Sequence, residues 1–221
     1  EKIPFIKMAA AGNDFIIIDN RSGNIQIYRE IIQKISDRKA WGCDQFIVLE
    51  NSKKADVFMQ IFNADGSEAG ACGNATRCVA SLIIKEQKKE KITIETISAV
   101  LLCWRDGDMI SVNMGQPSFN IDSNKIPLED LYRILKEEDF NFCNIGNPHL
   151  VFLDKILIEY EYKNNLLDFD FFYDSPLAKT INSPIMNTDY FEYLSNTVIG
   201  LFETNIEYIY PVNKNHIKVR V

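Results

Sequence analysis

The sequence predicts a mixed α/β protein made of two pseudo-symmetric domains. Short strand-like runs outnumber helical segments in the first half, and the turn at 115–117 (Gly-Gln-Pro) is followed by a region in which the pattern starts again. A Gly-Asn pair closely followed by an apolar run that ends in Asp occurs at 12–19 and again at 146–154. A match this short can also arise by chance, so the repeat is a hypothesis. We place the domain boundary at the turn and expect domains at 1–116 and 117–221.

The elements of the first half follow from the spacing of apolar residues. An amphipathic helix is expected at 28–38, where isoleucines recur at helical spacing. A second helix should follow the turn at 63–66, because apolar residues from Ala75 to Ile83 recur at intervals of one turn and lysines close the segment. Strands are expected at 15–18, 45–50, 57–62 and, as a meander, between 92 and 114.

The second half is less regular. A helix is expected near 128–136, and the segment 159–200 has little periodicity, so it is assigned only as mixed helix and loop. Strands are expected at 150–153, 205–212 and 216–221. The last run stops inside a strand, which favours a natural protein that continues beyond it.

Charge and cysteine content exclude several classes of partner. The formal net charge of -7 is unlike that of a protein that binds nucleic acid or an anionic membrane, so a small polar or zwitterionic ligand is expected. The absence of a long apolar run favours a cytoplasmic protein. The 5 cysteines are unevenly spaced and are interpreted as free thiols. No metal site is expected, because His149 and His216 lie far apart and no CxxC pair occurs.

Cys72 has the strongest chemical argument of its own. It stands immediately before the second expected helix, where backbone N–H groups are unpaired and the helix dipole favours an anion. We therefore expect a stabilised thiolate, and Gly73 would let a substrate carboxylate approach the same N–H groups. The plainer interpretation is a small buried residue near a turn, and the polar stretch at 63–68 weighs against it.

The motifs of this chain resemble, in order, those of the diaminopimelate epimerase family. The first cysteine motif of that family is similar to the runs 63–68 (Asn-Ala-Asp-Gly-Ser-Glu), 72–74 (Cys-Gly-Asn) and 77–78 (Arg-Cys). Other family signatures resemble the runs 7–8 (Lys-Met), 12–15 (Gly-Asn-Asp-Phe), 42–45 (Gly-Cys-Asp-Gln), 146–149 (Gly-Asn-Pro-His) and 204–205 (Thr-Asn). Each motif alone is weak, but their common order along nearly the whole chain is specific.

The resemblance implies an isomerase that needs no pyridoxal phosphate or other cofactor. It would interconvert LL- and meso-2,6-diaminopimelate in lysine and peptidoglycan precursor biosynthesis: one cysteine thiolate removes the α-proton, and a second thiol delivers a proton to the opposite face. The resemblance also implies a curved mixed sheet around a central helix in each domain, and it allows a homodimer. Cys72 would be one catalytic group, and His149 would tune the cysteine pair. Substrate contacts would come from Asn13, Gln45, Asn63, Gly73, Asn74, Asn147 and Asn205.

The chain departs from the family pattern at several places. Ala9 stands where a histidine usually follows Lys-Met, which should change local packing and not the chemistry. Ala75 stands where a glycine often follows Cys-Gly-Asn, and alanine should be harmless or favourable inside a helix. Nothing matches the Glu-Arg, the glycine-rich loop and the second cysteine that close the family's second half. Cys143 is the last cysteine and precedes a strand, so we do not assign it as the catalytic partner. We expect the natural protein to continue past Val221 and the second domain to be incomplete here.

Other functions fit parts of the same pattern. An inactive ligand-binding remnant would keep the pocket with one thiol, and a related racemase or isomerase would act on another amino acid. A Cys/His hydrolase is weaker, because no residue is an evident orienting partner for a pair of Cys72 and His149. Taken singly, the asparagines could be ordinary turn residues and His149 a hydrogen-bonded structural histidine.

Overall fold

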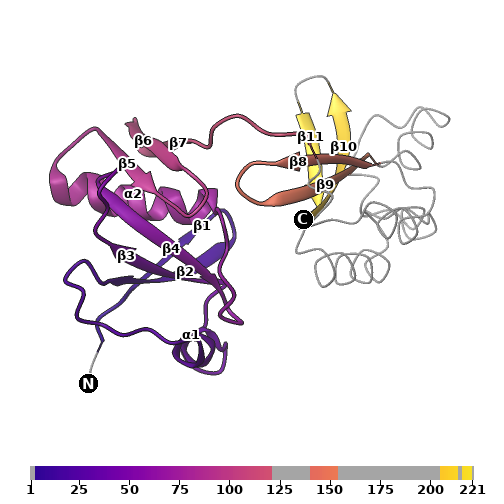
Figure 1. Cartoon of the computed structure of the whole chain (residues 1–221). Helices are drawn as coiled ribbons and strands as arrows, with labels where there is room; N and C mark the ends of the chain where they lie inside the picture. The colour runs from indigo at the N-terminus through magenta and orange to yellow at the C-terminus, as the bar shows by residue number, and fades with distance from the viewer. Residues whose placement is uncertain (1–2, 121–139, 154–204, 214–215, 221) are drawn as a thin grey trace. The chain divides into compact units, whose positions relative to one another are not determined.

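The computed structural model describes residues 3–120, 140–153, 205–213 and 216–220. The chain divides into two compact units, Glu1–Gln116 and Pro117–Val221, and each contains a sheet of its own (Figure 1). None of the helices in the described ranges is both long and apolar enough to cross a membrane.

The first unit is a 7-stranded mixed sheet in which the strands lie in sequence order. β2 pairs with β3 and β4 with β5 in parallel, and the other neighbours are antiparallel. The strands are β1 (Ile6–Ala10), β2 (Asn13–Asp19), β3 (Gln45–Glu50), β4 (Val57–Asn63), β5 (Lys91–Glu95), β6 (Val100–Asp106) and β7 (Met109–Asn113).

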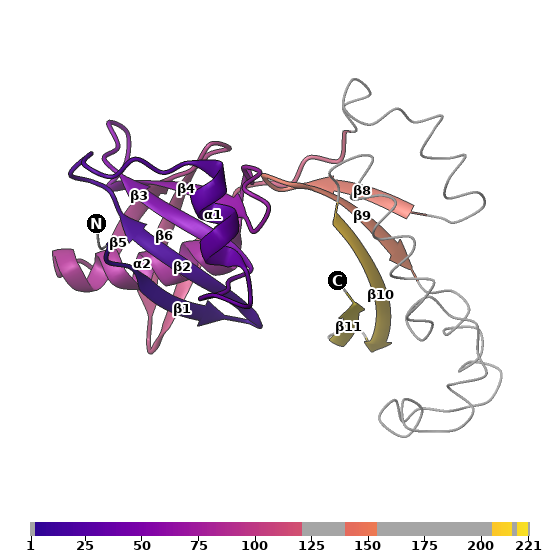
Figure 2. The same ribbon diagram turned by 90° about the horizontal axis from the view of Figure 1, so that it is seen from below.

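The sheet curves around one helix, α2 (Gly73–Gln87), which is the core of this unit (Figure 1). α2 buries Val79 and Ile83 against the sheet face that carries Phe15. The opposite face, which carries Ile16, packs against the shorter helix α1 (Arg29–Ser36), so the two helices lie on opposite sides of β2 and β3 (Figure 2). Because successive side chains of a strand point to opposite faces, a strand covered on both faces is apolar throughout, as the run 15–18 is.

The second unit contains a 4-stranded sheet in the order β11, β10, β9, β8. Its pairings are antiparallel between β8 and β9, parallel between β9 and β10, and antiparallel between β10 and β11. The strands β1 to β4 follow the same scheme in the first unit. The strands of the second sheet are β8 (Phe140–Asn144), β9 (Pro148–Leu153), β10 (Asn205–Asn213) and β11 (His216–Arg220).

The predicted fold class is confirmed: the protein is mixed α/β, with a curved mixed sheet around a central helix in the first unit. The strands β1 and β8 were not expected. β1 is an edge strand with mostly exposed or half-exposed side chains, so its sequence carries little apolar alternation. The expected helix at 128–136 and the mixed segment at 159–200 lie outside the described residues.

Candidate functional site

Three neighbouring strands of the first unit, β2, β3 and β4, carry polar side chains where they end on the same side of the sheet. Gln45 opens β3, next to Phe15 on β2 and opposite Asn63 at the end of β4. The Gln45 Nε2 group donates a hydrogen bond to Asn63 Oδ1 at 3.2 Å, and Asn63 Nδ2 donates to Ser67 Oγ at 3.1 Å. The strand register thus brings together two predicted substrate-binding amides that are distant in sequence.

Asn13 joins this edge through a tight hairpin. Ala11 and Gly12, between β1 and β2, have φ values of 47° and 88°, the positive values that a two-residue hairpin turn of the common type requires. Asn13 follows the turn, and its Oδ1 accepts a hydrogen bond of 2.9 Å from Asn74 Nδ2 at the start of α2. This bond connects two predicted site residues that are 61 positions apart.

Cys72 is the N-cap residue of α2, as its position in the sequence predicted. Its backbone is extended, with φ -153° and ψ 106°, and its half-buried Sγ accepts the Ala75 N–H at 3.4 Å. Thr76 donates to the Cys72 carbonyl through both its N–H, at 2.9 Å, and its hydroxyl, at 2.8 Å, which holds the cap in place. The first turn of α2 contains no acidic residue, so its N–H groups can still attract an anion.

The protonation of Cys72 differs from the sequence expectation. Burial raises the pKa of the thiol, and the nearby carboxylate of Asp44 adds to this, whereas hydrogen bonds from the N–H groups of Ala75 and Asn74 lower it. The net effect is a raised pKa, so the expectation of a stabilised thiolate in the free protein is wrong. Desolvation of the sulfur outweighs the partial positive charge of the helix start.

Gly73 is not required by the packing of the chain itself. A Cβ atom built at this position would lie 3.5 Å from the Met114 sulfur, an ordinary van der Waals contact. Its φ is not positive, unlike that of Gly12 or Gly66. Glycine here therefore keeps space open above the helix start without relieving backbone strain.

The second unit holds the other predicted residues, at the start of β9 and β10. His149 lies beside Asn205 in the parallel pair, and Asn205 Nδ2 contacts the Pro148 carbonyl at 3.5 Å. His149 Nδ1 is 2.5 Å from Glu207 Oε1, and both side chains are largely buried, with exposed fractions of 25% and 14%. Asn147 accepts a hydrogen bond from the Ile145 N–H through its backbone carbonyl at 3.2 Å.

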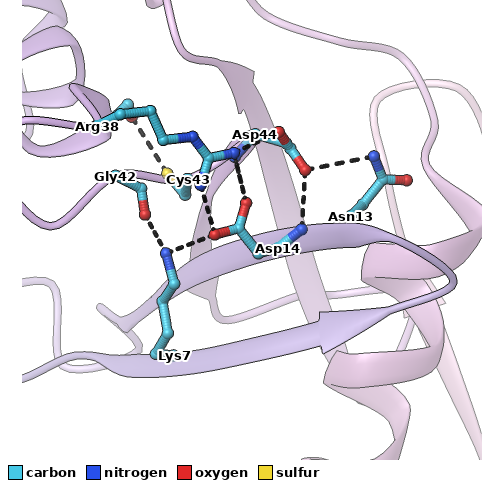
Figure 3. A network of polar contacts seen from close by, with 8 residues as sticks. Lys7, Asn13, Asp14, Arg38, Gly42, Cys43 and Asp44 are labelled. Atoms are coloured by element: carbon cyan, nitrogen blue, oxygen red, sulfur yellow. Dashed lines mark hydrogen bonds and ion pairs between the residues drawn. The ribbon is translucent and has the colours of Figure 1, made fainter.

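Glu207 is a candidate site residue that sequence reasoning missed. Its second carboxylate oxygen, Oε2, is buried and has no hydrogen-bond partner among the described residues. The sequence contains a signal for Glu207. Side chains two positions apart on a strand point to the same face, so this glutamate in an apolar strand shares the sheet face of Asn205. Asp14, Asp44 and Arg38, a network of ion pairs that reaches Asn13 through Asp44, were missed as well (Figure 3).

The sites thus form two groups, each within one unit. Cys72 and the predicted binding residues of the first unit lie around the start of α2 and the strand edge beside it. His149, Asn147 and Asn205 lie at the strand starts of the second unit. No cluster of three or more possible metal ligands occurs within the described ranges.

Known structures and sequences match both the fold and the motifs. A hydroxyproline epimerase from Agrobacterium vitis, solved with bound trans-4-hydroxy-L-proline, superposes with a TM-score of 0.52 at 10% identity over 97% of this chain and 68% of that one. A probable proline racemase from Agrobacterium radiobacter K84 gives 0.53 at 11% identity over 99% and 69%. At such low identity these matches show the fold alone, which this chain shares with the two structures.

Sequence comparison shows the family to which this chain belongs. The model of the diaminopimelate epimerase family matches residues 5–120. The diaminopimelate epimerase of Wolbachia sp. subsp. Drosophila simulans is 45% identical over 67% of this chain and 58% of its own length, and that of Pelagibacter ubique is 36% identical over 73% and 63%. The chain therefore belongs to the diaminopimelate epimerase family, and its match spans about six tenths of the length of these relatives.

Proposed function

We propose that these residues are part of an amino-acid epimerase that interconverts LL- and meso-2,6-diaminopimelate, with Cys72 as one of its two acid/base groups. The observation that supports it best is the thiol of Cys72 at the N-cap of α2, in a chain of this family. The reaction would need no pyridoxal phosphate or other cofactor, and it would serve lysine and peptidoglycan precursor synthesis in the cytoplasm.

The raised pKa of Cys72 leaves this residue a thiol in the free protein, the form that can donate a proton. To act as the base it must first lose that proton, and the thiolate then formed is a stronger base towards the weakly acidic α-hydrogen than one whose pKa is depressed. The thiolate takes the α-proton and forms an S–H bond, while the electron pair of the C–H bond moves towards the substrate carboxylate. A second thiol then protonates the opposite face and becomes the thiolate, so the centre is inverted and the charges balance.

The helix start would stabilise the charge that develops on the carboxylate. The N–H groups of the first turn and the dipole of α2 point towards Cys72, and we propose that the open position at Gly73 admits the ligand to hydrogen-bonding distance of this helix start. Asn13, Asn63 and Gln45, with Asn74, would provide neutral donors and acceptors for an amino-acid end of the substrate. Within the second unit, we propose Asn147 and Asn205 as substrate-binding residues and His149 as a catalytic residue.

The proposed reaction needs a second thiol. By resemblance to the family it would belong to the second cysteine motif, to which nothing in residues 1–221 corresponds. The proposed activity is therefore that of a protein that carries both cysteine motifs.

The test is an interconversion assay with the natural polypeptide that contains this sequence. LL-diaminopimelate, proline and glutamate are incubated separately, and stereoisomers are separated by chiral chromatography. We expect turnover of diaminopimelate alone, and a fall of about a hundredfold or more in C72A, because a positioned acid/base group contributes at least that factor. Binding of diaminopimelate without turnover would instead identify a ligand-binding protein, and turnover of proline would identify a different racemase.

A further inference from the structure

Two aspartates, Asp14 in β2 and Asp44 just before β3, precede the first residues paired between these parallel strands, and they are hydrogen-bonded to each other. Asp14 donates its backbone N–H to Asp44 Oδ2 at 2.9 Å, and Asp44 donates its own to Asp14 Oδ1 at 2.9 Å. Each carboxylate thus accepts from the other residue's main chain, where the strand ladder begins at Phe15 and Gln45. Such reciprocal bonds fix the relative position of the two strand starts.

Two cations neutralise these carboxylates. Arg38 donates to Asp14 through Nη1 at 2.7 Å and Nη2 at 2.8 Å, and its Nη2 also reaches Asp44 Oδ1 at 2.5 Å (Figure 3). Lys7 Nζ lies 2.8 Å from Asp14 Oδ2 and contacts the Gly42 carbonyl. Because a Cβ atom at Gly42 would stand 2.9 Å from Arg38 Cδ, glycine at this position makes room for the arginine.

The network ends at the side chain of Asn13. Asn13 Nδ2 donates to Asp44 Oδ2 at 3.4 Å, and Asn13 Oδ1 accepts from Asn74 Nδ2 at 2.9 Å. An ionised carboxylate can only accept, so it requires the nitrogen of the Asn13 amide on its own side and leaves the oxygen towards α2. Figure 3 shows Asn13 beside Asp44, which the guanidinium of Arg38 holds from the other side.

We propose that Arg38, Asp14 and Asp44 form a positioning network that fixes the orientation of the Asn13 amide, and through it that of Asn74, at the start of α2. The inference rests on the proposed function for its catalytic consequence, because Asn13 and Asn74 are substrate-binding residues there. None of the three network residues needs to touch the substrate. Their role is to decide which end of the amide is a donor and which an acceptor.

The first test replaces the carboxylate with an amide of the same shape. In D44N the group that faces Asn13 can donate or accept, so the Asn13 amide loses its single orientation. We expect the side-chain amide signals of Asn13 in ¹⁵N NMR spectra to shift or double. In the natural polypeptide the KM for diaminopimelate should rise about tenfold, the equivalent of one hydrogen bond, with kcat changed much less.

The second test uses two arginines with similar ion pairs. Arg38 is well exposed, so R38Q should fold normally, and it should show the same NMR and KM changes as D44N in weaker form, with partial recovery in R38K. Arg21 also bridges two carboxylates, those of Asp19 and Glu86, away from the site, so R21Q is a matched control that should leave both readouts unchanged.

Each outcome bears on one claim. Unchanged Asn13 signals in D44N, or equal changes in R21Q, would overturn the positioning role. Altered Asn13 signals together with a natural polypeptide that does not turn over diaminopimelate would support the network and refute the proposed function.

Discussion

The sheets of the two units share one pairing scheme but use the same positions differently. In the first, Phe15 on β2 and Ile47 on β3 are fully buried with 0% exposure and pack beneath α2. At the corresponding positions of the second sheet, two residues after Asn147 and two residues after Asn205, stand His149 and Glu207, which contact each other. Strand order and register therefore tolerate either a packed core or a polar pair on this face.

The comparison predicts that replacing the side chain by alanine at these equivalent positions has different effects on the stability of the first unit. F15A should destabilise the first unit by about 3–5 kcal/mol, because it leaves a cavity under α2. H149A should leave that unit unaffected. Both of the 2 tryptophans, Trp41 and Trp104, belong to the first unit, so the urea transition followed by their fluorescence separates the two effects. Equal shifts of this transition in the two variants would refute the assignment of a core role to one and a site role to the other.

Within the first unit, a buried core thiol, Cys103, can be compared with the thiol of the candidate site, Cys72. Burial raises the pKa of Cys103 to about 12, and it also raises that of the half-buried Cys72. Since the thiolate is the reactive form, iodoacetamide should modify Cys72 at least about a hundredfold faster than Cys103, with a rate that still rises above pH 9. Mass spectrometry of peptides labelled at several pH values measures this. A rate for Cys72 that is already constant at pH 7 would contradict the raised pKa.

The contact between His149 and Glu207 in the second unit can be altered by a substitution that keeps the size and shape of the side chain. E207Q replaces a carboxylate with an amide, so the bond to His149 Nδ1 no longer selects one tautomer of the ring. We expect mixed tautomers in ¹⁵N NMR spectra of His149 and a loss of about tenfold in kcat, the equivalent of one charged hydrogen bond. A single tautomer and full activity in E207Q would show that Glu207 has no positioning role.

The smallest expected effect is that of G73A, which tests whether the glycine at position 73 serves ligand binding or the stability of the fold. G73A should raise the stability of α2 by at most about 0.5 kcal/mol, because Gly73 is the first residue of the helix, where the preference for alanine is weaker than in the interior, and packing leaves room for the methyl group. The same variant should weaken binding of diaminopimelate, measured by calorimetry. Stronger or unchanged binding would mean that the substrate does not approach this helix start.

Much of the first unit could be predicted from local pattern. The expected strand at 45–50 has the bounds of β3, and the helix that begins after Cys72 is where its apolar spacing placed it. β1 was missed because its exposed edge position leaves little periodicity in the residues. The repeated Gly-Asn pair was informative, because each copy lies at the start of a strand that pairs in parallel with the next strand of its sheet, β2 with β3 and β9 with β10.

The site was harder to predict because long-range contacts complete it. Cys72 carries a local signal at a helix start, but its raised pKa depends on burial by residues distant in sequence, which no motif records. Similarly, Arg38 meets Asp14 only because the loop after α1 returns to the start of β2. Glu207 acquires its role from a parallel neighbour 58 residues away.

The central claim is that Cys72 exchanges a proton with the α-carbon of diaminopimelate. The most direct measurement is incorporation of deuterium from D₂O into LL-diaminopimelate, followed by NMR, for the natural polypeptide and its C72A variant. We predict that deuterium enters at the inverted α-carbon and that the exchange is lost in C72A. Exchange that proceeds undiminished without the Cys72 thiol, or tight binding with no exchange in the natural protein, would contradict the account.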